Sequence, residues 1–264
     1  MLLSQREPWD AVAEGYDATT RLPLRAFSEH ALEWTDLDDD AAILDVACGP
    51  GTLAELAASN DRRMLLTDWS DAMLDVARRR TADLPNVTLD KRDGQNLGVD
   101  AEFDAAFSMF GLMFFPDRHA GLTSMLQALK PGGVGVVSTW VPWEEASAMQ
   151  RGVGAALAAF PPKEETPVPQ NPFDTIDVVK AEMETAGFVD VEVERVALAF
   201  QWTVDEMWAL VADGFAPFAL ARQSMPDDEW NAGAERGLAW LRENHGADDK
   251  LEYVALIGKG RRRP

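Results

Sequence analysis

The stretch I-L-D-V-A-C-G-P-G-T-L-A at residues 43–54 decides the fold of this chain. It begins as an apolar strand, passes through a glycine turn and continues into a helix. Gly49 and Gly51 let the backbone turn sharply and approach a ligand without a Cβ atom in the way. The helix that follows directs its free N–H groups at the same place, and Asp45 adds a carboxylate near the mouth of the turn. The stretch therefore predicts a site for a nucleotide-like cofactor.

The composition limits the possible partners. The chain has 264 residues, is 47% hydrophobic and carries a formal net charge of −21. Such a charge argues against nucleic acid and anionic membrane surfaces, which reward basic patches. Cys48 is the single cysteine, so no intrachain disulfide can form, and no apolar run reaches the roughly 18 residues of a membrane span. We expect a soluble cytoplasmic protein, monomeric or homodimeric, with residues 261–263 as a frayed basic tail.

Strands alternate with helices between residues 40 and 140, which predicts a doubly wound, mostly parallel sheet of the α/β class. A helix is expected over 8–35, and a helix capped by Ser70 or Asp71 after the second strand. The sequence P-G-G at residues 131–133 predicts a helix stop and a turn. The expected strands of this core are 42–47, 64–67, 87–91, 103–108 and 134–139, with further helices over 52–59 and 118–129. Two later strands are expected over 189–199 and 251–257.

After residue 140 the pattern changes, and a single domain with insertions is expected. Residues 1–140 would form the N-terminal helices and the cofactor-binding core, and residues 176–202 and 246–264 would complete a seven-stranded sheet. Residues 141–175, with many prolines, and the aromatic, helical residues 203–245 would form a cap. Their place next to the strand ends predicts a mobile lid that fixes the choice of substrate.

Five pieces in order resemble the class I methyltransferase family, which uses S-adenosylmethionine. The likeness covers roughly residues 9–140 and the last two strands, and it is closest to the small-molecule branch that includes ubiquinone and menaquinone C-methyltransferases. The upstream W-D-A-V-A-E-G-Y-D is similar to that branch as well. The five pieces are L-D-V-A-C-G-P-G-T-L, T-D-W-S-D-A-M-L, R-D-G-Q-N-L, F-D-A-A-F-S-M-F-G-L and A-L-K-P-G-G.

This resemblance implies a Rossmann-like methyltransferase fold with S-adenosylmethionine as cofactor and S-adenosylhomocysteine as product. Asp45 and the backbone around Ala47 and Gly49 would hold the ammonium group, and Asp68 would accept hydrogen bonds from the ribose hydroxyls. The adenine would lie between Trp69 and Met73. The other residues implied to contact the cofactor are Gly51 in the turn, Asp93, Gly94 and Gln95 at the adenine, Ser108 and Met109 after the fourth strand, and Tyr16 and Arg21 over the methionine carboxylate.

Each of these residues also has a simpler interpretation. Asp68 could cap the next helix, Asp93 could be a turn residue, and Trp69 and Met73 could be ordinary core. Tyr16 and Arg21 could lie on the surface. The three histidines are scattered and are expected to be structural or exposed, and with one cysteine they form no metal-ligand pattern, so no metal is expected.

Two other functions compete with the methyltransferase hypothesis. G-P-G-T-L-A also satisfies the dinucleotide pattern of an NAD(P)-dependent oxidoreductase, with an acid about 20 residues on. Asp45 counts against it, because a carboxylate repels a pyrophosphate. A non-catalytic S-adenosylmethionine-binding protein is the other alternative.

A methyltransferase would work by proximity and in-line displacement, and no catalytic residue is named. Aromatic residues after the fourth strand and in the cap indicate a small apolar or aromatic methyl acceptor, although most of the cap aromatics are better read as the cap's own core. The acceptor atom stays open. The candidate walls are Phe110, Phe114, Phe115, Trp140, Trp143, Phe173, Trp202, Trp208, Phe215 and Phe218.

Overall fold

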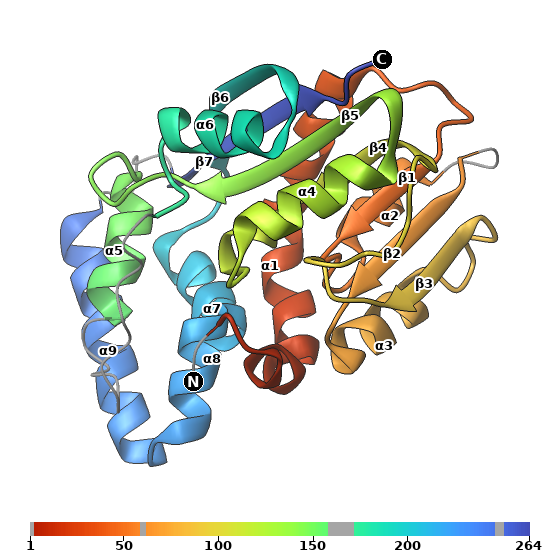
Figure 1. Cartoon of the computed structure of the whole chain (residues 1–264). Helices are drawn as coiled ribbons and strands as arrows, with labels where there is room; N and C mark the ends of the chain where they lie inside the picture. Colours follow the sequence, from red (N-terminus) through yellow and green to blue (C-terminus); the bar gives the residue numbers. More distant parts are fainter. Residues whose placement is uncertain (1–2, 59–61, 158–171, 246–250) are drawn as a thin grey trace.

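A seven-stranded sheet forms the centre of the molecule. The computed structural model describes residues 3–58, 62–157, 172–245 and 251–264 (Figure 1). The strand order is β3-β2-β1-β4-β5-β7-β6, so the direction of winding reverses between β1 and β4. The first five strands pair in parallel, and β7 runs antiparallel to both β5 and β6. The strands are β1 (Ile43–Val46), β2 (Met64–Asp68), β3 (Val87–Lys91), β4 (Phe103–Ser108), β5 (Leu129–Trp140), β6 (Val189–Phe200) and β7 (Leu251–Arg261).

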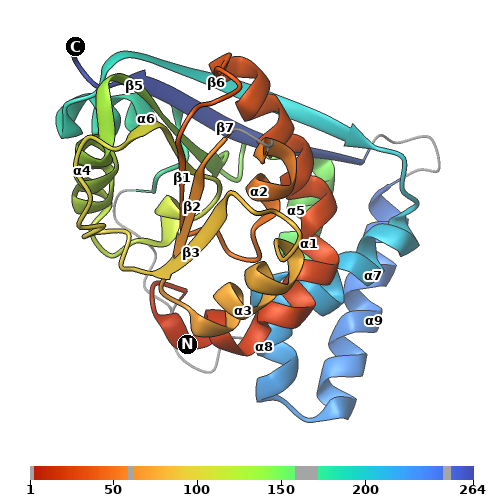
Figure 2. The same ribbon diagram turned by 90° about the vertical axis from the view of Figure 1, so that its right-hand side faces the viewer.

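Helices cover both faces of the sheet, as expected for a Rossmann-like methyltransferase fold. Because side chains alternate along β1, Leu44 packs with the helices of one face and Ile43 with those of the other. The first face carries α4 (Arg118–Ala128) and α6 (Ile176–Ala186). The second carries α1 (Arg6–Thr35), α2 (Thr52–Ala57) and α3 (Asp71–Arg80), and Figure 2 shows α1 running along it.

The remaining helices gather beside the sheet as a cap with its own core (Figure 1). The chain leaves the sheet at Phe200 and returns at Leu251, and these two residues are direct partners in the β6–β7 ladder. Val12 and Ala13 of α1 pack against Ala216 and Ala219, so the cap leans on the first half of α1. The cap helices are α5 (Ala148–Leu157), α7 (Val204–Gly214), α8 (Ala216–Ser224) and α9 (Asp227–Asn244). None of the helices in the described ranges carries an apolar stretch long enough to cross a membrane.

The C-terminal end differs from the expectation of a frayed basic tail. Strand β7 continues to Arg261, beyond its expected end at residue 257, and pairs with Val134. The backbone N–H of Arg262 donates to Gly133, and its guanidinium donates to the carbonyl of Gln127 at 2.7 Å. The arginine thus satisfies carbonyl groups left free at the end of α4. The tail prediction is wrong for these two arginines, because the antiparallel partner strand gives them backbone and side-chain acceptors.

The turn expected before β5 is also wrong, because the pairing of β5 with β7 begins there. The P-G-G segment falls inside β5, which begins at Leu129 rather than at residue 134. Gly132 keeps a left-handed φ of 81°, and its N–H donates to Arg262 at 3.0 Å. The segment therefore bends without leaving the sheet. The helix starts fit the sequence better, because Ser70 caps α3 through a hydrogen bond from the Met73 N–H.

Candidate functional site

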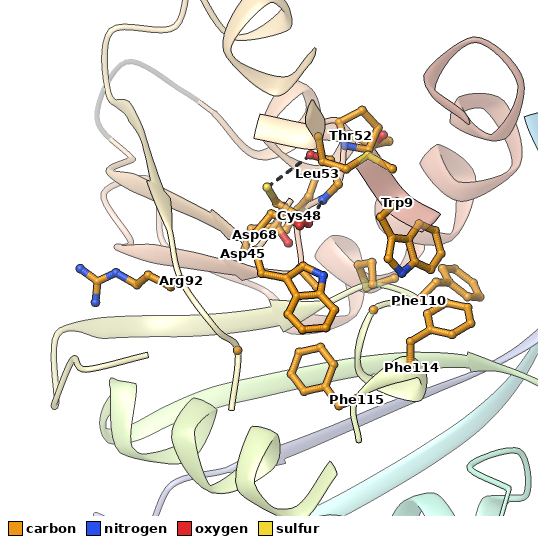
Figure 3. Close-up of a pocket in the computed structure, with 18 of the residues that line it drawn as sticks. Trp9, Asp45, Cys48, Thr52, Leu53, Asp68, Arg92, Phe110, Phe114 and Phe115 are labelled. Carbon is orange, nitrogen blue, oxygen red and sulfur yellow. Dashed lines mark hydrogen bonds between the residues drawn. The ribbon is translucent and has the colours of Figure 1, made fainter. Parts of the chain in front are cut away.

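A cavity that opens to solvent lies at the carboxyl ends of β1, β2 and β4 (Figure 3). It occupies the point where the winding of the sheet reverses, which is where open α/β sheets bind their ligands. Its walls come from the turn after β1, the end of β2, the loop after β3, and the loop and short 3₁₀ helix η1 (Leu112–Phe114) after β4. Helix α1 forms the remaining side, with Trp9 and Tyr16 in its first half and Leu24 and Ser28 in its second half.

The turn after β1 owes its shape to left-handed backbone angles. Ala47, Gly49 and Gly51 have φ values of 54°, 52° and 80°. A Cβ atom on Gly51 would lie 3.3 Å from side-chain atoms of Ala77 and Leu66, so glycine is required there for angle and for space. The turn is held by a hydrogen bond from the Gly51 N–H to the Cys48 carbonyl at 3.0 Å. Gly51 therefore shapes the cavity without lining it.

Asp45 places a buried carboxylate at the cavity. Its side chain is 2% exposed, and its Oδ2 atom has no hydrogen-bond partner among the residues that the structure describes. Burial, and then the charge of Asp68, raise the pKa of Asp45 well above its usual range. A buried carboxylate oxygen without a donor is costly in a folded protein. The arrangement fits a ligand that brings an N–H donor, and a cationic one best.

Asp68 supports the glycine turn from the end of β2. Its Oδ2 atom accepts from the Gly49 N–H at 2.9 Å, and Oδ1 accepts from the Ser70 N–H at 2.9 Å. Burial raises the pKa of Asp68 to about 6, although these backbone hydrogen bonds oppose the shift. Because the helix cap is Ser70, the capping interpretation of Asp68 does not describe this carboxylate. Each of its oxygens has a further lone pair to offer.

The loop after β3 forms the third wall. Asp93 accepts from the Gln95 N–H at 2.9 Å, which is the turn role that its simpler interpretation predicts, and it also lines the cavity. Gln95 in turn accepts from the Asp117 N–H at 2.9 Å. Gly94 lies against Phe115, where a Cβ atom would come within 2.4 Å of the ring. The loop is thus fixed by its own hydrogen bonds and by close packing.

Aromatic rings close the opposite side of the cavity (Figure 3). The Trp9 ring lies 5.0 Å from Phe114 and 5.7 Å from Tyr16, and its Nε1 donates to the Leu3 carbonyl at 2.8 Å. Phe110 has a φ of 58°, which is unusual for a bulky residue. Its N–H donates to the Ser138 hydroxyl at 2.9 Å. This hydrogen bond holds the strained residue at the cavity wall.

Of the residues expected to contact a cofactor, three do not line the cavity. Arg21 forms an ion pair with Glu55 at 2.8 Å, and its side chain is 46% exposed. Ser108 is fully buried and accepts from the Leu112 N–H at 3.1 Å. Gly51 acts through the turn. The structure brings the rest together around the cavity: Tyr16, Asp45, Ala47, Gly49, Asp68, Trp69, Met73, Asp93, Gly94, Gln95 and Met109.

The expected aromatic walls divide in the same way. Phe110, Phe114 and Phe115 line the cavity, whereas Trp143 is 53% exposed. The others do not line the cavity and pack in hydrophobic clusters: Trp140, Phe173, Trp202, Trp208, Phe215 and Phe218. Trp140 lies behind the cavity wall, with its ring 4.3 Å from that of Phe110. Trp9 also lines the cavity and was not predicted from the sequence, although it stands in the W-D-A-V-A-E-G-Y-D segment. Leu24, Ser28, Thr52 and Leu53 line it as well, and their apolar or small side chains carry no signal of their own.

Comparison with known proteins agrees with this geometry. Residues 43–133 match a family model described as a methyltransferase domain, a range that runs from β1 into β5. A demethylmenaquinone methyltransferase of Clavibacter sepedonicus is 38% identical over 92 residues, which are 34% of this chain and 38% of that protein. This chain spans less than half of the length of the demethylmenaquinone methyltransferases that it matches.

Two longer matches extend beyond that range. The methyltransferase tpcH of Aspergillus fumigatus is 26% identical over 238 residues, covering 83% of this chain and 84% of the relative. Among solved structures, the phosphoethanolamine N-methyltransferase 2 of Haemonchus contortus, in complex with S-adenosyl-L-methionine, has a TM-score of 0.63. It is 17% identical, with 97% of this chain and 57% of that chain covered. At this identity the structural likeness shows the fold alone.

Proposed function

We propose that this chain is a class I methyltransferase, which binds S-adenosylmethionine and transfers its methyl group to a small apolar or aromatic molecule. The observation that carries the proposal is the buried Asp45 carboxylate oxygen, left without a partner in the described residues and facing a cavity beside a glycine turn. A cofactor with an ammonium group supplies the missing donor. It would also place a cation beside two carboxylates, Asp45 and Asp68.

The other cavity residues fit the parts of the same cofactor. Asp68 has lone pairs left to accept hydrogen bonds from ribose hydroxyls. We assign the adenine to the space between Trp69 and Met73, with Asp93, Gly94 and Gln95 at its edge. Ala47, Gly49 and Met109 would contact the methionine part, and Tyr16 would cover it from α1. We leave Arg21 and Ser108 out of this assignment, because Arg21 pairs with Glu55 and the Ser108 hydroxyl accepts from the Leu112 N–H.

When bound, S-adenosylmethionine supplies a methyl group on a positively charged sulfur, which is already a strong electrophile. The chain has to exclude water and to orient the acceptor, which is catalysis by proximity. Trp9, Phe110 and Phe114 offer an apolar surface for the acceptor. The described lining residues include no histidine and no lysine, which favours an acceptor that needs no strong base from the protein.

The insertions at residues 141–175 and 203–245 are proposed to influence acceptor choice through α1. Residues 158–171, which include most of the prolines of the first insertion, lie outside the described residues. The described residues of both insertions do not line the cavity, but α8 packs on Val12 and Ala13 of α1. Trp9 and Tyr16 belong to the same part of α1, so the position of α8 bears on the aromatic wall.

Isothermal titration with S-adenosylhomocysteine and with NAD tests the cofactor. We expect micromolar binding of the first and none of the second. NAD binding without S-adenosylhomocysteine binding would instead support the oxidoreductase alternative.

Transfer of labelled methyl groups to a panel of phenols, quinols, carboxylic acids and amines then tests the enzyme. Binding of the cofactor with no transfer to any of them, and with no room for an acceptor in a structure of the complex, would favour a non-catalytic binding protein.

A further inference from the structure

Arg80, the last residue of α3, connects three segments behind the glycine turn. Its Nη1 donates to the Pro50 carbonyl at 2.9 Å and to Oδ1 of Asp17 at 2.7 Å. Its Nε donates to Oε1 of Glu55 at 3.0 Å, and Nη2 lies 2.8 Å from Oε2 of the same carboxylate. One side chain therefore contacts the glycine turn, helix α2 and helix α1.

The site is built to hold this cation. The Arg80 side chain is only 10% exposed, and a charge so far buried requires ionic partners. Asp17 and Glu55 are 24% and 18% exposed. Partial burial raises the pKa of Glu55, but hydrogen bonds and charge from Arg80 and Arg21 lower it further, to below its ordinary value. A planar guanidinium with several donors suits this set of acceptors, which an ammonium group cannot reach together.

Other ion pairs between α1 and α3 have a different character. Arg79 pairs with Glu14, and their side chains are 56% and 78% exposed. Arg6 pairs with Asp71 at 3.5 Å, with 39% and 61% exposure. Pairs as exposed as these contribute little to stability. Arg79 pairs with Glu14 of α1 and not with the glycine turn, so it offers a matched control for Arg80.

The contacts of Arg80 lie directly behind the cavity. Pro50 lines the cavity through the turn that carries Gly49. Asp17 follows Tyr16, which lines the cavity from α1. A change in the turn on cofactor binding would reach α1 through one buried, hydrogen-bonded group. Such a group connects the two segments physically, because Nη1 carries two N–H donors and contacts both Asp17 and the Pro50 carbonyl.

We infer that Arg80 is a positioning residue that couples occupation of the glycine turn to the docking of α1 over the cavity. The inference rests on the proposed function, since S-adenosylhomocysteine is the ligand whose binding should be transmitted. Arg80 does not line the cavity. It acts through Pro50 and Asp17.

The experiment combines titration with S-adenosylhomocysteine and hydrogen exchange, on the full chain and on four variants. In the unchanged protein we expect binding and new protection in residues 9–25. Arg80→Gln should weaken binding roughly 2- to 30-fold and abolish the new protection in α1. Arg79→Gln should keep both the affinity for S-adenosylhomocysteine and the new protection in α1. Asp17→Ala, which leaves the Arg80–Glu55 pair intact, should lose the protection in α1 with a smaller loss of affinity.

The outcomes separate the inference from the proposed function. No binding by the unchanged protein would refute both. Binding and protection in α1 that persist in Arg80→Gln and Asp17→Ala would overturn the inference and leave the proposed function standing. Should Arg80→Gln fail to fold, Asp17→Ala decides alone. The Arg80→Lys protein should fold and bind S-adenosylhomocysteine but should not show the new protection in α1. Lysine retains the positive charge, but it lacks the planar guanidinium with its several donors.

Discussion

The sheet with its cavity and the helical cap are both rich in aromatic residues, but they use them differently. In the cap, Phe218 packs 5.5 Å from Trp208 and 6.4 Å from Trp230, and all three are buried in one cluster. At the strand ends, Trp9 and Phe114 pack against each other and still face open space. The comparison teaches that aromatic content alone does not mark a ligand site. Position at the carboxyl ends of parallel strands does.

The largest effect expected from this comparison concerns stability of the cap. Phe218→Ala removes a fully buried ring and should lower the free energy of unfolding by about 3–5 kcal/mol. The affinity of the folded protein for S-adenosylhomocysteine should change less than about twofold, because Phe218 does not line the cavity. Chemical denaturation and calorimetric titration measure the two quantities. A strong loss of affinity in a folded variant would show that the cap core does more than support itself.

The next effect is a dependence of the unliganded protein on pH. The pKa of Asp68 is raised from 3.8 to about 6, so the folded protein holds a proton that the unfolded chain releases. The raised pKa adds roughly 2–3 kcal/mol to the free energy of unfolding at low pH. This stabilisation is complete below about pH 4 and is lost as pH rises through about 6. Denaturation between pH 4 and 7 should show this loss in the unchanged protein relative to Asp68→Asn. Parallel curves for the two proteins would contradict it.

Asp68→Ala should also weaken binding of S-adenosylhomocysteine, by about 1.5–3 kcal/mol, the range for hydrogen bonds to a charged group. Part of the loss comes from the glycine turn, since the Gly49 N–H loses its acceptor. Asp104→Ala is the control, because Asp104 lies at the far end of β4 and pairs with Lys130. A change below a few tenths of a kcal/mol in a folded Asp68→Ala protein would remove Asp68 from the proposed binding residues.

The smallest effect should come from the aromatic wall itself. Trp9→Leu loses edge contacts with Phe114 and Tyr16, which contribute about 0.5–1.5 kcal/mol beyond area burial. The free energy of unfolding should fall by at least that amount, and transfer to aromatic acceptors should fall more than cofactor binding. Trp143 is exposed and does not line the cavity. Trp143→Leu should therefore leave both the stability and the methyl transfer unchanged. Equal effects of the two substitutions would erase the distinction between the two regions.

The sequence predicted the cavity well where local pattern and strand order are enough. The glycine turn, the carboxylate after β2 and the loop after β3 follow strand ends, and parallel strands bring such ends to one edge. It could not predict contacts set by packing over long separations. Arg80 contacts Asp17 and Pro50 only in the folded chain. The exposed position of the Arg21 side chain likewise depends on its ion pair with Glu55. The pairing of β7 beyond residue 257 escaped detection for the same reason.

The pairing of Phe200 with Leu251 has a consequence for how such a protein can change. Everything between them leaves and re-enters the sheet at adjacent positions, so a short hairpin turn could in principle join β6 to β7 directly. The glycine turn and the strand ends that carry the cavity would keep their pairing partners. An exchange of residues 201–250 for another segment is therefore open to evolution and to design. The surface of α1 at Val12 and Ala13 would be the place to adjust, because α8 now covers it.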